Sequence, residues 1–227
     1  MKTYDLSSAS LRELNQALHD ADLTAGEREW RVANPNGAHN IACGLNAPIS
    51  VDIDGHAGYY CAGMNQEANV TIHGNVGVGV AENMMSGMVR VKGDASQSAG
   101  ATAHGGLLVI EGNASARCGI SMKGVDIVVK GNIGAMSAFM GQAGSLVVCG
   151  DAGEALGDSL YEVHIYVKGK VASLGADCVE KEMRQEHLEE LTALLKRAGI
   201  DDDPAAFKRY GSARQLYNFK VDNASAY

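Results

Sequence analysis

A glycine that recurs at a fixed interval is the feature that most constrains this 227-residue chain. Seven glycines follow one another with a spacing of 19 residues: Gly55, Gly74, Gly93, Gly112, Gly131, Gly150 and Gly169. Six equal intervals in a row identify an internal repeat, and a repeat of this kind constrains the architecture more than any single motif does. A unit of 19 residues is too short for two packed helices, so the chain must stack small, similar units.

The positions around each repeat glycine show what one unit contains. Residues two and four positions before it are Val, Ile or Leu in every unit, the alternation of a short strand. Residues three and seven positions after it are Gly, Ala or Ser, as expected where backbones pass close together. An Asn or Asp usually follows the glycine, which is typical of turns with positive φ.

These patterns predict an all-β solenoid. Stacking the units in parallel lets each strand pair with its counterpart one coil away and buries a continuous Val/Ile ladder. We expect a single-stranded parallel β-helix of about seven 19-residue coils, roughly 34 Å long at ~4.8 Å per coil.

A helix and a capping coil are predicted before the repeats, in a region that we place at 1–48. Ser10 and Glu13 have the spacing of a capping box and open an amphipathic segment. Counting back 19 residues from Gly55 puts Val32 at the strand position four before the glycine, so Trp30 to Asn46 fits a degenerate coil that covers the open end.

A second helix and an aromatic tail are predicted after the β-helix of residues 49–176, in a region that we place at 177–227. Asp177 and Glu180 repeat the capping-box spacing, and the apolar periodicity continues to a stop at Gly199. We expect this helix to cap the C-terminal end of the coil.

Composition narrows the classes of function. The net charge is −8 and basic residues do not cluster, so nucleic-acid binding lacks its electrostatic basis. No signal peptide or membrane-spanning run is recognisable, and we expect a cytoplasmic protein. The five widely spaced cysteines fit reduced, mostly buried thiols better than disulfides or a zinc or iron–sulfur site.

The sequence motifs predict no catalytic, cofactor-binding or metal site in this chain. Gly74-Asn-Val-Gly77-Val-Gly79 looks like a phosphate loop, but the next strand follows within one period where a dinucleotide site needs a helix. The seven histidines fall at different repeat positions without the spacing of metal ligands. No pair of nucleophile and base can be argued.

Two short segments and the tail are candidates for contact with a partner or a tunnel. The pairs at 39–40 and 82–83 lie outside the small and Val/Ile positions, and the simpler alternative is that they shape bends. The tail concentrates aromatic residues, which either pack back on the coil or face a partner. The candidates are His39, Asn40, Glu82, Asn83, Tyr210, Arg214, Tyr217 and Phe219.

The Val-x-Val-x-Gly-Asn/Asp repeats over roughly Ile49 to Ala176 resemble the GXGXG β-helix domain that closes the large subunit of glutamate synthase. One of the chains of formylmethanofuran dehydrogenase resembles the same family. The flanks Asn34–Asn40 and Tyr210–Asn223 are similar to stand-alone members, such as the middle subunit of N-methylglutamate synthase. The resemblance implies a right-handed coil.

This resemblance implies a non-catalytic assembly subunit of an FMN-dependent complex that makes N-methyl-L-glutamate from methylamine and L-glutamate. It implies a hetero-oligomer with two partners, a class II glutamine-amidotransferase-like subunit and an FMN-binding, glutamate-synthase-like subunit. FMN and an iron–sulfur cluster would belong to these partners. Three alternatives stay open: a subunit of another glutamate-synthase-like amidotransferase complex, a formylmethanofuran dehydrogenase subunit, or a free-standing β-helical enzyme.

Overall fold

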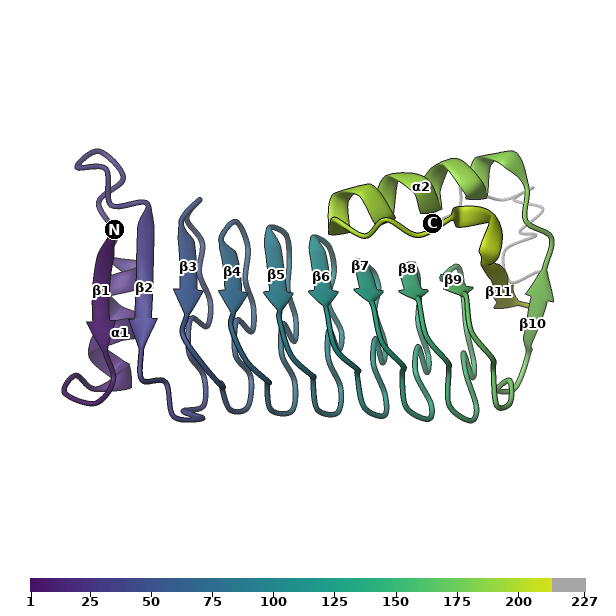
Figure 1. Ribbon diagram of the computed structural model, residues 1–227, viewed down its shortest axis with the longest axis horizontal. Helices are drawn as coiled ribbons and strands as arrows, with labels where there is room; N and C mark the ends of the chain where they lie inside the picture. The colour runs from purple at the N-terminus through teal and green to yellow at the C-terminus, as the bar shows by residue number, and fades with distance from the viewer. Residues whose placement is uncertain (214–227) are drawn as a thin grey trace, which may run out of the picture.

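The computed structural model describes residues 1–213 and shows an elongated coil of parallel strands with a helix associated with each end (Figure 1). Strands of successive repeats pair 19 residues apart, as Val51 does with Val70. The predicted β-solenoid of about seven coils with flanking helices is confirmed. Its repeat strands are β3 (Ser50–Ile53), β4 (Asn69–Ile72), β5 (Met88–Val91), β6 (Leu107–Ile110), β7 (Lys123–Val129), β8 (Ala143–Val148) and β9 (His164–Val167).

The core of the coil lies between two walls. One wall carries the inward-facing residues of the strands, such as Val70 and Ile72, which are fully buried. The other wall is held by single-residue parallel bridges two positions after the repeat glycine, the first joining Ala57 to Val76. Apolar burial along this length is the main source of stability, and it requires few aromatic rings because the walls lie close together.

The repeat glycines are required by the distance between successive coils. A Cβ on Gly112 would lie 2.7 Å from the carbonyl oxygen of Gly93 and 2.3 Å from Asp94 Oδ1. Among the seven, Gly55 alone has a positive φ, so the interpretation of the Gly-Asn/Asp pairs as positive-φ turns is wrong. Instead, the Asn or Asp side chain accepts the backbone N–H one coil later, as Asp94 does from Asn113 at 2.7 Å.

The N-terminal cap is a β-α-β unit of β1 (Lys2–Asp5), α1 (Leu11–His19) and β2 (Glu29–Ala33). Strand β2 pairs in parallel with both β1 and β3, so it belongs to the predicted capping coil. Trp30 pairs with Val51, 21 residues later, which makes this coil two residues longer than the repeats. Val32 therefore lies opposite Ile53, two positions before the glycine rather than the four that we predicted.

Helix α1 completes hydrogen bonds that a missing coil would otherwise make. The predicted capping box of Ser10 and Glu13 begins the helix. Further along it, Asn15 Oδ1 accepts the N–H of Ala42 at 2.9 Å and Asn15 Nδ2 donates to Asn40 O at 2.8 Å. In the next coil the equivalent N–H, that of Ala62, donates to Ile41 O. Asn15 therefore ends the ladder of inter-coil hydrogen bonds.

Replacing Asn15 with alanine should lower the free energy of unfolding by about 1–2 kcal/mol, because it leaves the buried N–H of Ala42 without an acceptor. Urea unfolding followed by circular dichroism measures this change. The matched control is Gln16→Ala on the exposed side of α1, where the side chain bonds only Asp20 among residues 1–213. Equal stabilities of the two variants would refute a capping role for Asn15.

The C-terminal segment differs from the prediction in two ways. Residues Cys178–Lys181 form strand β10, and α2 spans Gln185–Ala198, so the predicted capping box at Asp177 and Glu180 does not start the helix. The predicted stop at Gly199 is confirmed by its φ of 68°. After the short 3-10 helix Pro204–Ala206, strand β11 (Lys208–Ser212) pairs antiparallel with β9 and β10. The β10–β11 pair rather than α2 therefore covers the end of the coil.

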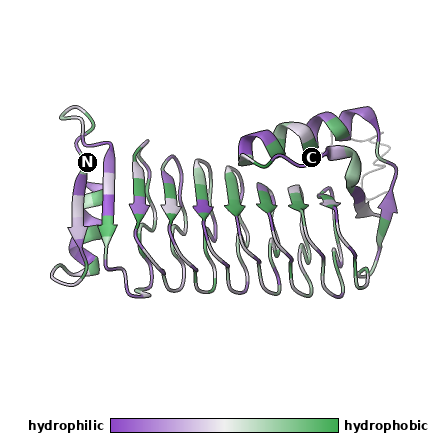
Figure 2. Cartoon of the chain, in the orientation of Figure 1, coloured by the Kyte–Doolittle hydropathy of each residue, from purple (hydrophilic) through white to green (hydrophobic). Residues whose placement is uncertain are grey.

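Helix α2 lies along the side of the coil, over the outward face of strands from β6 onward (Figure 1). These strands are buried on both faces, and Figure 2 shows β6 as hydrophobic along its length. Leu191, Leu194 and Leu195 of α2 pack on the strands in a second apolar cluster. Arg90 of β5 donates to Ala198 O at 2.8 Å and so caps the last turn of the helix. The outward residues in this cluster are Leu107, Val109, Val128, Val147 and Tyr166.

Candidate partner-binding groove

A groove of about 350 Å³ opens on the segments that connect one strand to the next in the first coils. It spans three consecutive coils, the capping coil and the first two repeats. We call it the Tyr60 groove. It is lined by Asn40, Cys43, Tyr60, Gly63, Met64, Glu82 and Asn83.

Alternating left-handed residues shape the wall of the Tyr60 groove. Tyr60, Ala62 and Met64 have φ values of 58°, 53° and 57°. The backbone N–H groups of these residues point alternately to the next coil and to the preceding one, since Tyr60 donates to Val78 O and Ala62 donates to Ile41 O. Ala62 is therefore buried, while Tyr60 and Met64 project outward with 45% and 53% of their surface exposed. Equivalent residues of later coils share this conformation, so it belongs to the fold.

Large apolar side chains are exposed around the groove. Tyr59 and Met85 are each about half exposed, like Tyr60 and Met64. The ring of His39 stacks on Tyr59 with centroids 4.4 Å apart, and its Nδ1 accepts the N–H of Tyr59 at 2.9 Å. Later coils carry smaller or polar residues where Tyr59 and Tyr60 stand. We call Tyr59, Tyr60, Met64 and Met85 the Tyr-Met patch. Its tyrosine pair is local to the first coils, whereas a later coil exposes Met140 at the position of Met64. Grouped apolar side chains on a surface mark interaction sites.

Glu82 supplies the negative charge of the groove. It is half-buried, and within residues 1–213 no Lys, Arg or His side chain forms an ion pair with it. Cys43 donates its thiol to Tyr60 O at 2.8 Å, and burial raises the pKa of this thiol, so Cys43 is neutral at pH 7. A ligand that brings a cation can therefore form an ion pair with Glu82 that residues 1–213 do not supply.

The structure brings together one group of the predicted interface residues and separates another. Asn40, Glu82 and Asn83 line the groove, and His39 borders it through Tyr59. Tyr210 lies in β11 beyond β9 at the opposite end of the coil and is 6% exposed, so it packs back on the coil (Figure 1). Arg214, Tyr217 and Phe219 lie outside the described residues. The exposed Tyr59, Tyr60 and Met64 are additions that the sequence reasoning missed.

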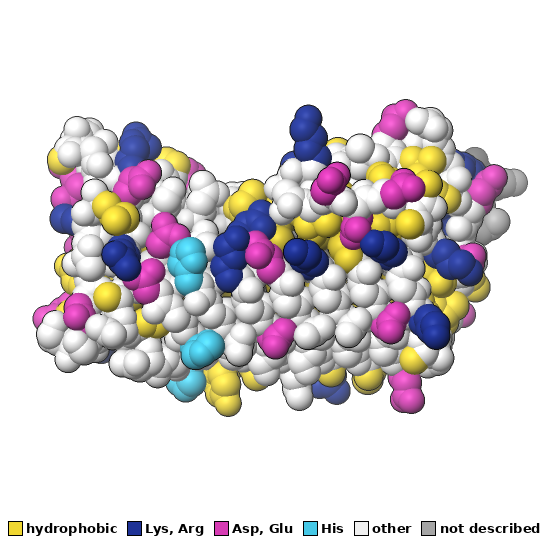
Figure 3. Space-filling view, in the orientation of Figure 1, with side chains coloured by type: hydrophobic (Ala, Val, Ile, Leu, Met, Phe, Trp, Pro, Cys, Tyr) yellow, Lys and Arg dark blue, Asp and Glu magenta, His cyan; other side chains and the backbone are white. Residues whose placement is uncertain are grey.

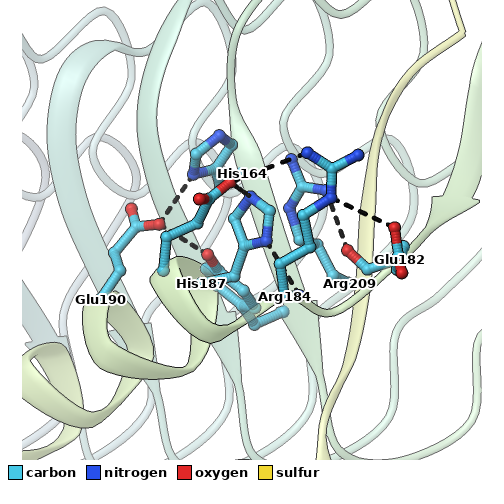
Figure 4. Close-up of polar contacts among 8 residues, drawn as sticks. His164, Glu182, Arg184, His187, Glu190 and Arg209 are labelled. Atoms are coloured by element: carbon cyan, nitrogen blue, oxygen red, sulfur yellow. Dashed lines mark hydrogen bonds and ion pairs between the residues drawn. The ribbon is translucent and has the colours of Figure 1, made fainter.

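A second polar cluster joins α2 to the strands beneath it (Figure 4). Glu190 accepts hydrogen bonds from Ser145 at 2.8 Å, from His164 at 2.8 Å and from the hydroxyl of Tyr166 at 2.6 Å. Burial raises the pKa of Glu190, but these hydrogen bonds outweigh burial and bring its pKa to about 2. Ser145 and His164 both bond Glu190 rather than each other, so the cluster fastens α2 and does not form a nucleophile–base pair.

Ion pairs extend this attachment along the border of α2. Arg197 lies 2.9 Å from Asp126, and Lys168 lies 2.7 Å from Asp202 in the segment after α2. Figure 3 shows acidic and basic side chains interspersed along this border. The polar border and the apolar cluster together fix α2 on β6–β9.

The Glu190 cluster predicts a pH-dependent attachment of α2. Because the pKa of Glu190 is lower in the folded chain than its ordinary 4.5, its contribution is complete above pH 4.5 and is lost as pH falls toward 2. Glu190→Gln should lower the free energy of unfolding at pH 7 by about 1–2 kcal/mol, a discounted value because a third of the side chain is exposed. The variant should also lose less stability than the wild type as pH falls below 4.5. Urea unfolding at several pH values tests this, with exposed Glu189→Gln as control. A parallel pH dependence in wild type and Glu190→Gln would disprove it.

Other chemistry-bearing residues occupy separate places. All five cysteines are free thiols, three of them buried, as the spacing predicted. Within residues 1–213, no group of three or more His, Cys, Asp or Glu side chains is placed to hold a metal ion. In the same part of the chain, no helix has the length and apolar character needed to cross a membrane.

Comparison with known proteins places the chain among relatives. It is 62% identical to Protein GlxC of Rhizobium meliloti (strain 1021) over 228 aligned residues, which cover 100% of both chains. The chain belongs to the GlxC family. No family model and no solved structure matches this GlxC family member.

The GlxC match runs from end to end and so takes in both caps as well as the repeats. At this identity two chains share their fold, and the GlxC family therefore has the β-solenoid with its flanking helices as one unit. This full-length match is compatible with the resemblance to stand-alone β-helical subunits.

Proposed function

We propose that this GlxC family member is a non-catalytic assembly subunit of a glutamate-synthase-like complex. The observation that carries the proposal is the Tyr-Met patch at the Tyr60 groove, because tyrosine and methionine are enriched in the cores of protein interfaces. The repeats, which resemble the β-helix of glutamate synthase, favour this kind of complex. In this role the coil holds catalytic partners in a fixed arrangement.

The proposed partners are a class II glutamine-amidotransferase-like subunit and an FMN-binding, glutamate-synthase-like subunit. The complex would form N-methyl-L-glutamate from methylamine and L-glutamate in the cytoplasm, with FMN and an iron–sulfur cluster in the partners. A rigid coil suits this role, because ordering flexible segments on binding reduces affinity and a preformed surface avoids that cost. The ladder of inter-coil hydrogen bonds supplies this rigidity.

Co-purification tests the proposal. The chain, tagged, is expressed together with the products of neighbouring genes, and the purified material is examined for added subunits, flavin absorbance and N-methylglutamate formation. We expect a yellow hetero-oligomer. Tyr60→Ser combined with Met64→Ser should reduce partner recovery at least tenfold, whereas Met140→Ser, at the position equivalent to Met64 in a later coil, should not. A colourless, solitary wild-type protein would refute the proposed function.

A further inference from the structure

We propose that the Tyr60 groove binds an arginine side chain of a partner subunit. As a docking site this rests on the proposed function, because the occupant is a component of the complex. The first argument is charge complementarity: Glu82 is a half-buried carboxylate for which residues 1–213 supply no cation. A basic side chain of a partner would complete an ion pair that residues 1–213 leave open.

The second argument is the position of an aromatic ring beside this carboxylate. A side chain added at Gly79 would start 2.7 Å from Tyr60 Cδ1 and 2.8 Å from Glu82 Oε2. The Tyr60 ring and the Glu82 carboxylate therefore both lie beside Gly79. A cation can contact both groups at once, and the attraction of a cation to a tyrosine ring adds to the ion pair.

The remaining lining favours arginine over lysine. A guanidinium is planar, stacks on rings and presents several N–H donors, whereas an ammonium is a compact and strongly hydrated charge. Asn40 and Asn83 also line the groove, although Asn83 Oδ1 already accepts the hydroxyl of Thr102 at 2.7 Å. Met64 is exposed and provides an apolar contact for the stem of the incoming residue. The neutral thiol of Cys43 adds no competing charge.

The site itself is tested on the isolated chain. The methionine methyl groups are labelled with ¹³C, and N-acetyl-arginine-methylamide is titrated to millimolar concentration while NMR shifts are followed. We expect Met64 to shift in the wild type, Met140 to stay unchanged, and the Met64 shift to vanish in Glu82→Gln. No shift at Met64, or an equal shift in Glu82→Gln, would overturn the proposal.

The role of the site in assembly is tested in the co-expressed complex. Glu82→Lys should reduce partner recovery at least tenfold, and Glu154→Lys, an exposed acidic position in a later coil, should leave it unchanged. Full recovery with Glu82→Lys overturns the docking role while leaving the proposed function intact. If the wild type recovers no partner, the proposed function fails and docking on a partner fails with it, whereas the titration still decides whether the groove binds arginine.

Discussion

Gly112→Ala should destabilise the chain by about 3–5 kcal/mol, even though it adds a single methyl group to the bend that follows β6. The added Cβ would lie 2.3 Å from Asp94 Oδ1 and 2.7 Å from the carbonyl oxygen of Gly93, and real Cβ contacts are not that short. Since coils press on both sides, the coil can accept the methyl only by separating from its neighbour and weakening the inter-coil hydrogen bonds. Urea unfolding followed by circular dichroism measures the loss.

The matched control is Gly211→Ala in β11. Its Cβ would meet nothing nearer than Lys181 Cγ at 3.6 Å, an ordinary contact, so we expect a change within about 1 kcal/mol. Similar losses at Gly112 and Gly211 would contradict the explanation of the repeat glycines by coil spacing.

Val128→Asp should release α2 from the coil and cost about 3–5 kcal/mol, because it places an unpaired carboxylate in a fully buried apolar cluster. The expected signature is faster hydrogen exchange of the α2 amides around Leu191 and Leu195, while the amides of β3–β5 stay protected. Hydrogen exchange resolved by mass spectrometry distinguishes this local release from global unfolding.

Thr71→Asp is the control for this variant, because Thr71 occupies the same position of β4, where α2 does not cover the strand. The residue faces outward, is partly exposed and lies between Asp52 of β3 and Arg90 of β5. Repulsion from Asp52 opposes attraction to Arg90, so a carboxylate there should change stability by less than about 1 kcal/mol. Equal effects at Val128 and Thr71 would contradict the docking of α2 on this face.

The fold was predictable because the same sequence pattern occurs in seven successive units. Each coil restates the same strand, glycine and small positions, and pairing 19 residues apart is the arrangement that aligns them all. The capping coil was predicted, but the position of Val32 within it was wrong, because this coil is two residues longer than the repeats and a single irregular unit offers no other units for comparison.

The location of α2 left a signal that the sequence reasoning did not use. The position three before the repeat glycine is polar in the first coils and apolar from Val109 onward, which indicates strands covered on both faces. Reading that change would have placed the amphipathic helix on the side of the coil. The series runs Asp52, Thr71, Arg90, Val109, Val128, Val147 and Tyr166.

Part of the Tyr60 groove was predictable from residues that do not follow the repeat pattern. His39, Asn40, Glu82 and Asn83 were chosen because they leave the repeat columns, and the structure gathers them around one groove. Tyr60 and Met64 could not be chosen in that way, because the direction of their side chains depends on alternating left-handed residues that periodicity does not reveal. The bulk of Tyr59-Tyr60 against smaller residues in later coils was the available signal.

The most direct test of the proposed assembly role is to mix the two proposed partners, an amidotransferase-like and an FMN-binding subunit, with and without this chain. Native mass spectrometry then gives the mass of the resulting complex. We predict that the two partners form one stable complex when this chain is present and remain separate in its absence. A stable complex of the two partners that forms equally well without this chain would contradict the account.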